Sequence, residues 1–305
     1  MKWRKQIPNA LRTFTVSACM LLFCRSSALT AAESVVNPPI QVGGSVDALH
    51  DTSVTDAEIG FKLIFNAMLV EANESFSIKI YDSHEELLEN FKSGKIQAVY
   101  TSSLKLLELG DWVHPTGRYV VQYGPYLKQR YLLLVRNNQK IANLADLRGK
   151  KLSIAAGHVV GERFLNVKLL QQGLTESEQF FGEIERVKEV NTAVVNLFFG
   201  QADAALVPEF SYELACELNP QLRSSISVFF SSSPMVYEVI GLRYDFPQER
   251  IDRIEPHIFG IELSKRIERL FKTFRVNRLY RLNEETLKEV IELNKTYYAL
   301  SHKTL

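Results

Sequence analysis

The sequence predicts an α/β protein with two similar lobes, each built on a parallel sheet. Three observations predict this fold: strand and helix patterns alternate after residue 40, the alternation occurs twice, and two apolar strand patterns connect the halves. A length of 305 residues with 46% hydrophobic residues suits two compact cores and excludes a disordered chain. The expected division is 33–127 for lobe 1, 128–236 for lobe 2 and 237–305 for a segment that returns to lobe 1.

The first half shows the pattern strand, helix, strand, helix, strand. The strands are expected at Ile40–Val46, Phe76–Tyr81 and Ile96–Tyr100. Capping boxes at Thr55–Glu58 and Ser83–Glu86 indicate the two helix starts, because a hydroxyl and a carboxylate can each satisfy an orphan backbone N–H. The apolar stripe expected to bury the first helix is Ile59, Leu63, Ile64, Ala67 and Met68.

The second half repeats this pattern. Strands are expected at Lys151–Ala155 and Ala204–Val207, with one helix from Gly161 to Gly173 and another opened by Thr192. The two connecting strands are Tyr131–Arg136 and Met235–Arg243. A chain that crosses over and returns makes a two-segment hinge, and two open sheets that face each other form a binding cleft beyond the carboxyl ends of their strands.

The N-terminal segment, residues 1–32, has the three parts of a secretory signal: a basic start, an apolar run and small residues. The apolar run, Thr13–Cys24, is shorter than the roughly 20 residues that a membrane span needs. We expect cleavage after Ala32, with Ala28 as the alternative, and a periplasmic location. Lipid anchoring at Cys19 is disfavoured because the apolar run continues past it.

Charge and cysteine content narrow the class of protein. The 36 basic and 35 acidic residues nearly cancel, so nothing indicates nucleic-acid binding. After residues 1–32 only one cysteine is left, Cys216, which excludes an internal disulfide in that part of the chain. Its helical surroundings, with no histidine or asparagine nearby in sequence, favour a buried inert thiol over a nucleophile.

Signatures of catalysis are missing from the sequence. It has no G-x-S-x-G elbow, P-loop, H-E-x-x-H or G-x-G-x-x-G motif, and its six histidines form no metal-ligand pair on one helix face. We therefore expect a protein that is not an enzyme and that uses no metal or cofactor.

Two stretches carry a resemblance to a known family. The strand Tyr131–Arg136 is followed by Ile141–Ile154, which has the pattern I-x-x-L-x-D-L-x-G-K, and residues 200–204 have the pattern G-x-x-D-A. The chain resembles the periplasmic solute-binding proteins of ABC transporters with two crossover strands (type II), and is most similar to their phosphate, phosphite and phosphonate branch. That branch has a Ser/Thr-rich loop after the first strand of lobe 2, whereas the corresponding residues here, 155–161, contain no hydroxyl.

The resemblance implies a binding function with a separate membrane partner. The expected ligand is small and anionic, similar to phosphonate or phosphate, and the expected partner is the permease of an ABC transporter. A membrane sensor kinase is the alternative partner, and a dehydratase-like enzyme using His158 and Glu209 is the alternative function. A cleft that must open favours a monomer.

Candidate ligand-binding residues follow from the predicted strand ends and the crossing. They are Asp47, Ser102, Ser103, Tyr126, Gly157, His158, Asn191, Thr192 and Glu209. His158 is expected in a turn that needs little side-chain packing, which favours a ligand contact. The alternatives are helix capping for Ser102, Ser103 and Thr192, hinge packing for Tyr126 and a solvated loop carboxylate for Glu209.

Two further charged features are expected to be structural. Asp203 follows a helix-ending glycine, where a carboxylate bonds nearby backbone N–H groups. Seven basic residues between Lys265 and Arg281 are expected on the solvated face of a helix rather than at an acidic partner.

Overall fold

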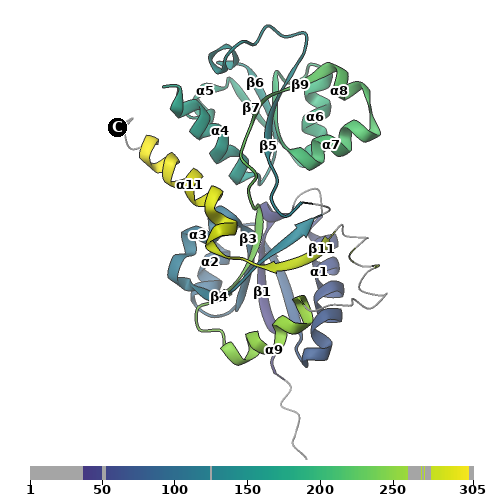
Figure 1. Cartoon of the computed structure of the whole chain (residues 1–305), viewed down its shortest axis with the longest axis vertical. Helices are drawn as coiled ribbons and strands as arrows, with labels where there is room; N and C mark the ends of the chain where they lie inside the picture. The colour runs from purple at the N-terminus through teal and green to yellow at the C-terminus, as the bar shows by residue number, and fades with distance from the viewer. Residues whose placement is uncertain are drawn as a thin grey trace, which may run out of the picture. The chain divides into compact units, whose positions relative to one another are not determined.

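The computed structural model describes residues 37–49, 53–123, 126–259, 269, 271 and 276–301. Within these residues the chain forms two sheets with helices packed on them, which we call lobe 1 and lobe 2 (Figure 1). The predicted signal peptide and Cys19 lie outside the described residues. No helix among the described residues combines the length and apolar character needed to cross a membrane.

The sheet of lobe 1 has six strands in the order β11-β4-β10-β3-β1-β2. Their bounds are β1 Ile40–Ser45, β2 Phe76–Tyr81, β3 Ala98–Ser102, β4 Val113–Tyr123, β10 Glu238–Arg243 and β11 Val276–Arg281. β1 is parallel to both β2 and β3, whereas β10 and β11 run antiparallel to their neighbours. The helices of this lobe are α1 Val54–Leu69, α2 His84–Lys92, α3 Ser103–Leu109 and α9 Gln248–Phe259, with short 3-10 turns at Val46–Ala48, Val70–Ala72 and Gly110–Trp112.

The sheet of lobe 2 has five strands in the order β7-β6-β8-β5-β9. Their bounds are β5 Tyr131–Arg136, β6 Lys151–Ala155, β7 Glu183–Val187, β8 Ala204–Pro208 and β9 Ile226–Ser231. β6 is parallel to both β7 and β8, and β5 is antiparallel to β8 and β9. The helices of this lobe are α4 Val159–Gln171, α5 Ser177–Phe180, α6 Val190–Phe198, α7 Glu209–Leu218 and α8 Gln221–Ser225, with a 3-10 turn at Leu144–Leu147.

Two chain segments cross between the sheets, one before β5 and one before β10. They pair with each other through reciprocal backbone hydrogen bonds between Gln129 and Met235, of 2.9 and 2.7 Å. Both sheets and both crossings agree with the predicted two-lobed α/β fold. The last helix, α11 Glu284–Ser301, follows β11 and packs against both α3 and α4.

The first predicted capping box is two residues out of place. α1 is capped by Ser53, whose hydroxyl accepts the Asp56 N–H at 3.1 Å, so Thr55 lies inside the helix. The predicted stripe is also only partly buried. Ile64 and Met68 enter the core, but Ile59 and Leu63 are 50% and 43% exposed, because the buried face of α1 is turned away from them.

Three other expectations need correction. Gly161 lies within the first turn of α4, which starts at Val159, and Thr192 lies in the third position of α6, which starts at Val190 with Glu189 as its N-cap. The end of the basic stretch is a strand, β11, rather than a helix. Its Arg281 pairs with Glu255 of α9, so this cation is part of the lobe 1 structure.

Other expectations are confirmed. Ser83 caps α2 by accepting the Glu86 N–H at 3.2 Å. Cys216 is buried and free. Asp203 accepts the Lys151 N–H at 3.0 Å, which is the structural role expected for it.

Candidate functional site

The carboxyl ends of the parallel strands define one edge of each sheet. In lobe 1, β1, β2 and β3 lead directly toward α1, α2 and α3. In lobe 2, β6, β7 and β8 lead toward α4, α6 and α7. Loops at this edge are where open α/β sheets bind ligands, and most of the predicted site residues lie at these two edges.

The lobe 1 edge carries helices that are capped by serine side chains. Ser53, Ser83 and Ser102 each accept a backbone N–H three residues later, at 3.1, 3.2 and 3.3 Å. Ser102 is the last residue of β3 and is 6% exposed. Its hydroxyl serves as the α3 cap, as the structural alternative expected, and it keeps a proton that it can donate elsewhere.

Ser103 connects the lobe 1 edge to the second crossing. Its hydroxyl donates to the Val236 carbonyl at 2.6 Å, and its N–H donates to the Tyr237 carbonyl at 2.6 Å. The residue is fully buried. Ser103 therefore fixes the hinge to the start of α3, and this bond uses the hydroxyl that was expected to face a ligand.

The loop after β1 lies beside the end of β3. The Tyr100 hydroxyl donates to the Ala48 carbonyl at 3.2 Å, and Tyr100 pairs in register with Gly44 of β1. This bond fixes the 3-10 turn that contains Asp47. The Asp47 side chain lies outside the described residues.

The lobe 2 edge differs in the N-cap residues of its three helices. The N-caps of α4, α6 and α7 are His158, Glu189 and Pro208, and none of them makes a side-chain cap hydrogen bond. Helix N-termini carry partial positive charge and backbone N–H donors, so uncapped N-termini favour anions. Since β6 lies between β7 and β8, the α4 N-terminus is the central one of the three.

Gly157 and His158 form the loop between β6 and α4. Gly157 has φ +84°, a conformation that favours glycine. His158 is 1% exposed, and its Nδ1 lies 3.0 Å from the Tyr131 hydroxyl. The expected turn with little packing is therefore wrong for this side chain, because its ring packs edge-on against Tyr131, whereas the backbone of the loop stays at the strand end.

Tyr131 connects this loop to the hinge. Its ring stacks on Tyr237 of the second crossing with centroids 4.5 Å apart, and the Tyr237 hydroxyl donates to the Arg130 carbonyl at 2.7 Å. Burial raises the pKa of both tyrosines well above the ordinary value. A continuous set of contacts thus runs from Ser103 through Tyr237 and Tyr131 to His158, so both strand-end edges adjoin the hinge.

Asn191 and Thr192 lie in the first turn of α6, at the same edge, and both are exposed. Thr192 was one alternative for the cap of this helix, and that alternative is wrong because its own N–H donates to the Glu189 carbonyl at 3.1 Å.

Glu209 begins α7, directly after β8. Its N–H donates to the Arg130 carbonyl at 2.9 Å, and its carboxylate lies 3.9 Å from the Arg130 side chain. The Glu209 side chain is 33% exposed. A carboxylate in the first turn is favoured by the helix dipole, which is the structural alternative to a ligand role.

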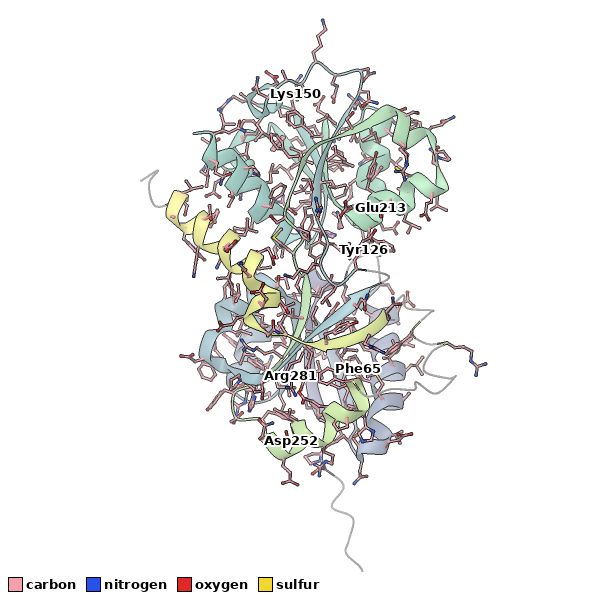
Figure 2. The ribbon with its side chains drawn as sticks, viewed as in Figure 1. Phe65, Tyr126, Lys150, Glu213, Asp252 and Arg281 are labelled. Atoms are coloured by element: carbon pink, nitrogen blue, oxygen red, sulfur yellow. The ribbon has the colours of Figure 1, made fainter. Side chains whose placement is uncertain are left out.

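Glu213 lies one turn further along α7, on the same face as Glu209, and sequence reasoning missed it. The Tyr126 hydroxyl donates to Glu213 at 3.2 Å, and Figure 2 shows these two side chains beside each other. The Glu213 carboxylate raises the pKa of Tyr126. Two carboxylates four residues apart on a helix repel each other, so this spacing was a signal that the sequence offered.

Tyr126 therefore connects the first crossing to α7. Its ring also meets Phe210 with centroids 6.1 Å apart in an edge-on arrangement. The crossing, the start of α7 and both glutamates thus form one acidic, aromatic-lined cluster beside the β8 end. Among the described residues no group of histidine, cysteine and acidic side chains could hold a metal ion.

Comparisons with known proteins identify the family. The model of the family "ABC transporter, phosphonate, periplasmic substrate-binding protein" matches residues 48–287. The chain belongs to this family. Its members are the substrate-binding components of membrane transporters, so a small-molecule ligand and an ABC permease are the partners that this membership implies. No curated protein matches the chain.

Solved structures show the same fold at low sequence identity. XAC2383 from Xanthomonas citri bound to ATP has 14% identity and a TM-score of 0.68, covering 87% of this chain and 99% of its own. PhnD1 from Prochlorococcus marinus in complex with methylphosphonate has 14% identity and a TM-score of 0.63, covering 85% and 98%. A binding protein of an ABC phosphonate transporter from Pseudomonas aeruginosa has 10% identity and a TM-score of 0.64, covering 87% and 88%.

Proposed function

We propose that this protein binds a small organic phosphonate that carries a cationic group, and delivers it to an ABC permease. The observation that carries the proposal is the division of charge along the lobe 2 edge. The α4 N-terminus, whose N-cap His158 makes no side-chain cap bond, favours an anion, and Glu209 and Glu213 of α7 favour a cation. A ligand with both charges would span these neighbouring positions, because β6 adjoins both β7 and β8.

The anionic head is assigned to the loop after β6 and the start of α6. Gly157 lets the backbone approach a ligand closely, and Asn191 and Thr192 add exposed side-chain donors. The cationic group is assigned to Glu209, Glu213 and the Tyr126 hydroxyl. Repulsion between the two glutamates would be relieved by such a ligand, which gives their placement a functional reason.

Lobe 1 supplies the opposing surface. Ser102 can donate its remaining proton, and the Asp47 turn lies beside it. His158 and Ser103 act behind the ligand, by fixing the Gly157 loop and the start of α3 to the hinge. Closure of one lobe over the ligand would then shield it from water and present the closed form to the permease.

Support for a binding role rather than catalysis comes from the same geometry. The one acid–base pair expected for an enzyme, His158 with Glu209, has its histidine buried against Tyr131. We propose that the chain is exported with residues 1–32 removed and acts as a monomer in the periplasm.

The test is isothermal titration calorimetry and thermal shift against a panel of phosphate, phosphite, methylphosphonate, aminoalkylphosphonates, sulfate, carboxylates and amino acids. A ligand at 100 times its Kd stabilises the native state by about 2.7 kcal/mol, so the true ligand gives a clear shift. We expect the largest shift with an aminoalkylphosphonate and a smaller one with methylphosphonate. A response to carboxylates or amino acids alone would overturn the proposed ligand.

A further inference from the structure

The C-terminal helix α11 joins the hydrophobic cores of the two lobes. Its contacts run from α3 in lobe 1 to α4 in lobe 2, and Figure 1 shows it beside both. Leu287 is 1% exposed and belongs to a cluster with Leu106 and Val239 of lobe 1. Val290, less than one turn later, is fully buried in a cluster that contains Phe164 of α4.

Polar contacts fix the second half of α11 to lobe 2. Arg163 of α4 donates to the Asn294 side chain at 2.7 Å, and its guanidinium lies 4.0 Å from the centre of the Tyr297 ring. The Tyr297 hydroxyl lies 3.0 and 3.1 Å from the two carboxylate oxygens of Glu176, just before α5. Arg163 is thus held by a hydrogen bond and a cation–π contact from the same helix.

A third contact reaches the first crossing itself. The Lys128 ammonium lies 2.7 Å from the Glu289 carboxylate and also donates to the Glu285 carbonyl at 3.3 Å. Lys128 lies next to Gln129, which pairs with Met235 of the second crossing. Helix α11 therefore contacts lobe 1, lobe 2 and the crossing between them.

The two crossings alone make a weak mechanical connection. Their backbones pair at one bridge, beside the Tyr237 hydroxyl bond to the Arg130 carbonyl, and hinges of this kind absorb large backbone changes within a few residues. By contrast, α11 is one continuous helix of 18 residues, roughly 27 Å long. Separating α4 from α3 requires α11 to leave one of them.

We propose that α11 is a third connection between the lobes, and that Arg163 is a positioning residue that sets how far lobe 2 moves relative to lobe 1. The inference goes beyond ligand binding, because it concerns the free protein and needs no ligand. It predicts that the range of lobe positions is controlled from a site outside the strand-end edges.

The experiment measures the distance between spin labels on exposed helix positions of the two lobes, Lys62→Cys in α1 and Glu217→Cys in α7. The full chain carries Cys19→Ser, Cys24→Ser and Cys216→Ala, so that only these two positions are labelled. The test variant is Arg163→Ala with Tyr297→Phe. The matched control is Arg186→Ala, which removes ion pairs with Glu162 and Glu178 of the same lobe but no contact with α11.

We expect the distance distribution of the test variant to broaden, and that of the control to keep its width. Amide exchange in residues 294–301 should become about tenfold faster in the test variant alone, as expected for losing a cation–π contact and its hydrogen bonds. Faster exchange with an unchanged distance distribution would overturn the proposal. A chain that ends at Leu293 keeps Leu287 and Val290 but lacks Asn294 and Tyr297. It should broaden the distance distribution as well, and it provides a second test if the double variant does not fold.

Discussion

Helices that follow the parallel strands begin differently in the two lobes. In lobe 1 three serines cap them, and in lobe 2 the N-caps are His158, Glu189 and Pro208, none with a side-chain cap bond. In a capped N-terminus the side chain of the N-cap residue accepts one of the orphan N–H groups, whereas the lobe 2 helix starts use other acceptors; the Glu209 N–H, for example, donates to the Arg130 carbonyl. The two edges therefore differ in how their helices begin, although both have the same strand and helix order.

The lobes also differ in how their edges join the hinge. Lobe 1 uses backbone acceptors: Ser103 bonds the Val236 and Tyr237 carbonyls. Lobe 2 uses stacked rings, with Tyr131 between Tyr237 and His158. Aromatic rings in a buried stack cannot shift without disturbing their neighbours, so the lobe 2 loop is held more rigidly than its exposed position on a strand end implies.

The largest effect is expected from neutralising the acidic part of the lobe 2 edge. Glu209→Gln combined with Glu213→Gln should weaken the affinity for an aminoalkylphosphonate at least about hundredfold, because each of two hydrogen bonds to a charged group contributes about 1.5–3 kcal/mol. Methylphosphonate, which has no cationic group, should bind nearly as well as before. Calorimetric titration measures the affinity of the variant for both ligands. Equal losses for the two ligands would show that these glutamates act on the fold rather than on a cation.

The next effect tests the rigidity of the lobe 2 loop. In Gly161→Ala the new Cβ would lie 2.6 Å from two atoms of the Tyr131 ring, which is buried and stacked, so we expect a loss of about 2 kcal/mol. In lobe 1, the Cβ of Gly44→Ala would lie 2.4 Å from Ile80 Cδ1, the flexible end of a side chain, so its cost should stay below about 1 kcal/mol. Urea unfolding of both variants measures the difference. Equal stabilities would mean that the Tyr131 stack adjusts as freely as Ile80.

Continuous apolar or alternating patterns predicted the strands well. Phe76–Tyr81, Tyr131–Arg136 and Lys151–Ala155 have the expected bounds. The first strand alternates between buried and less buried residues, whereas the other two are buried almost throughout, as their apolar runs indicate. Helix starts were less predictable, since Ser53 and Thr55 offer the same capping chemistry and the structure has Ser53 as the N-cap. The helix predicted for the basic stretch was also wrong at its end, where β11 forms the edge strand of the lobe 1 sheet. The other strands of that sheet are distant in sequence, so no local pattern indicates this pairing.

Candidate site residues were predicted where they follow a strand end, and missed where only three-dimensional contacts reveal them. Ser102, Gly157 and Glu209 lie at strand ends, as expected. The spacing of Glu209 and Glu213 was a local signal for Glu213, but its pairing with Tyr126 spans 87 positions and has no local pattern. Likewise, the burial of His158 depends on Tyr131, whose ring comes from the hinge.

A smaller effect distinguishes two serine caps of lobe 1 that have the same local geometry. Ser83→Ala and Ser102→Ala should each lower the free energy of unfolding by about 1 kcal/mol, because each removes one N-cap bond. Only Ser102→Ala should also weaken methylphosphonate binding, by about fivefold, since a neutral hydrogen bond contributes about 1 kcal/mol. Unfolding curves and titrations of the two variants provide the comparison. If affinity changes equally in both, Ser102 has no role beyond capping.

The smallest effect concerns acid stability in lobe 2, away from the candidate site. The Ala142 and Asn143 N–H groups donate to Asp146 at 2.8 and 3.0 Å and hold the pKa of its carboxyl below the usual 3.8. A depressed folded-state pKa stabilises the protein at pH values above the unfolded value, and this stability is lost as pH falls through the lower folded value. Asp146→Asn should therefore flatten the decline in melting temperature below about pH 4, relative to the unchanged chain. The exposed Asp111 of lobe 1 supplies the matched control, Asp111→Asn, which should keep the steeper decline. Since the bonds to Asp146 hold the turn that leads into β6, an identical acid response in the two variants would show that this turn does not depend on the charge of the carboxylate.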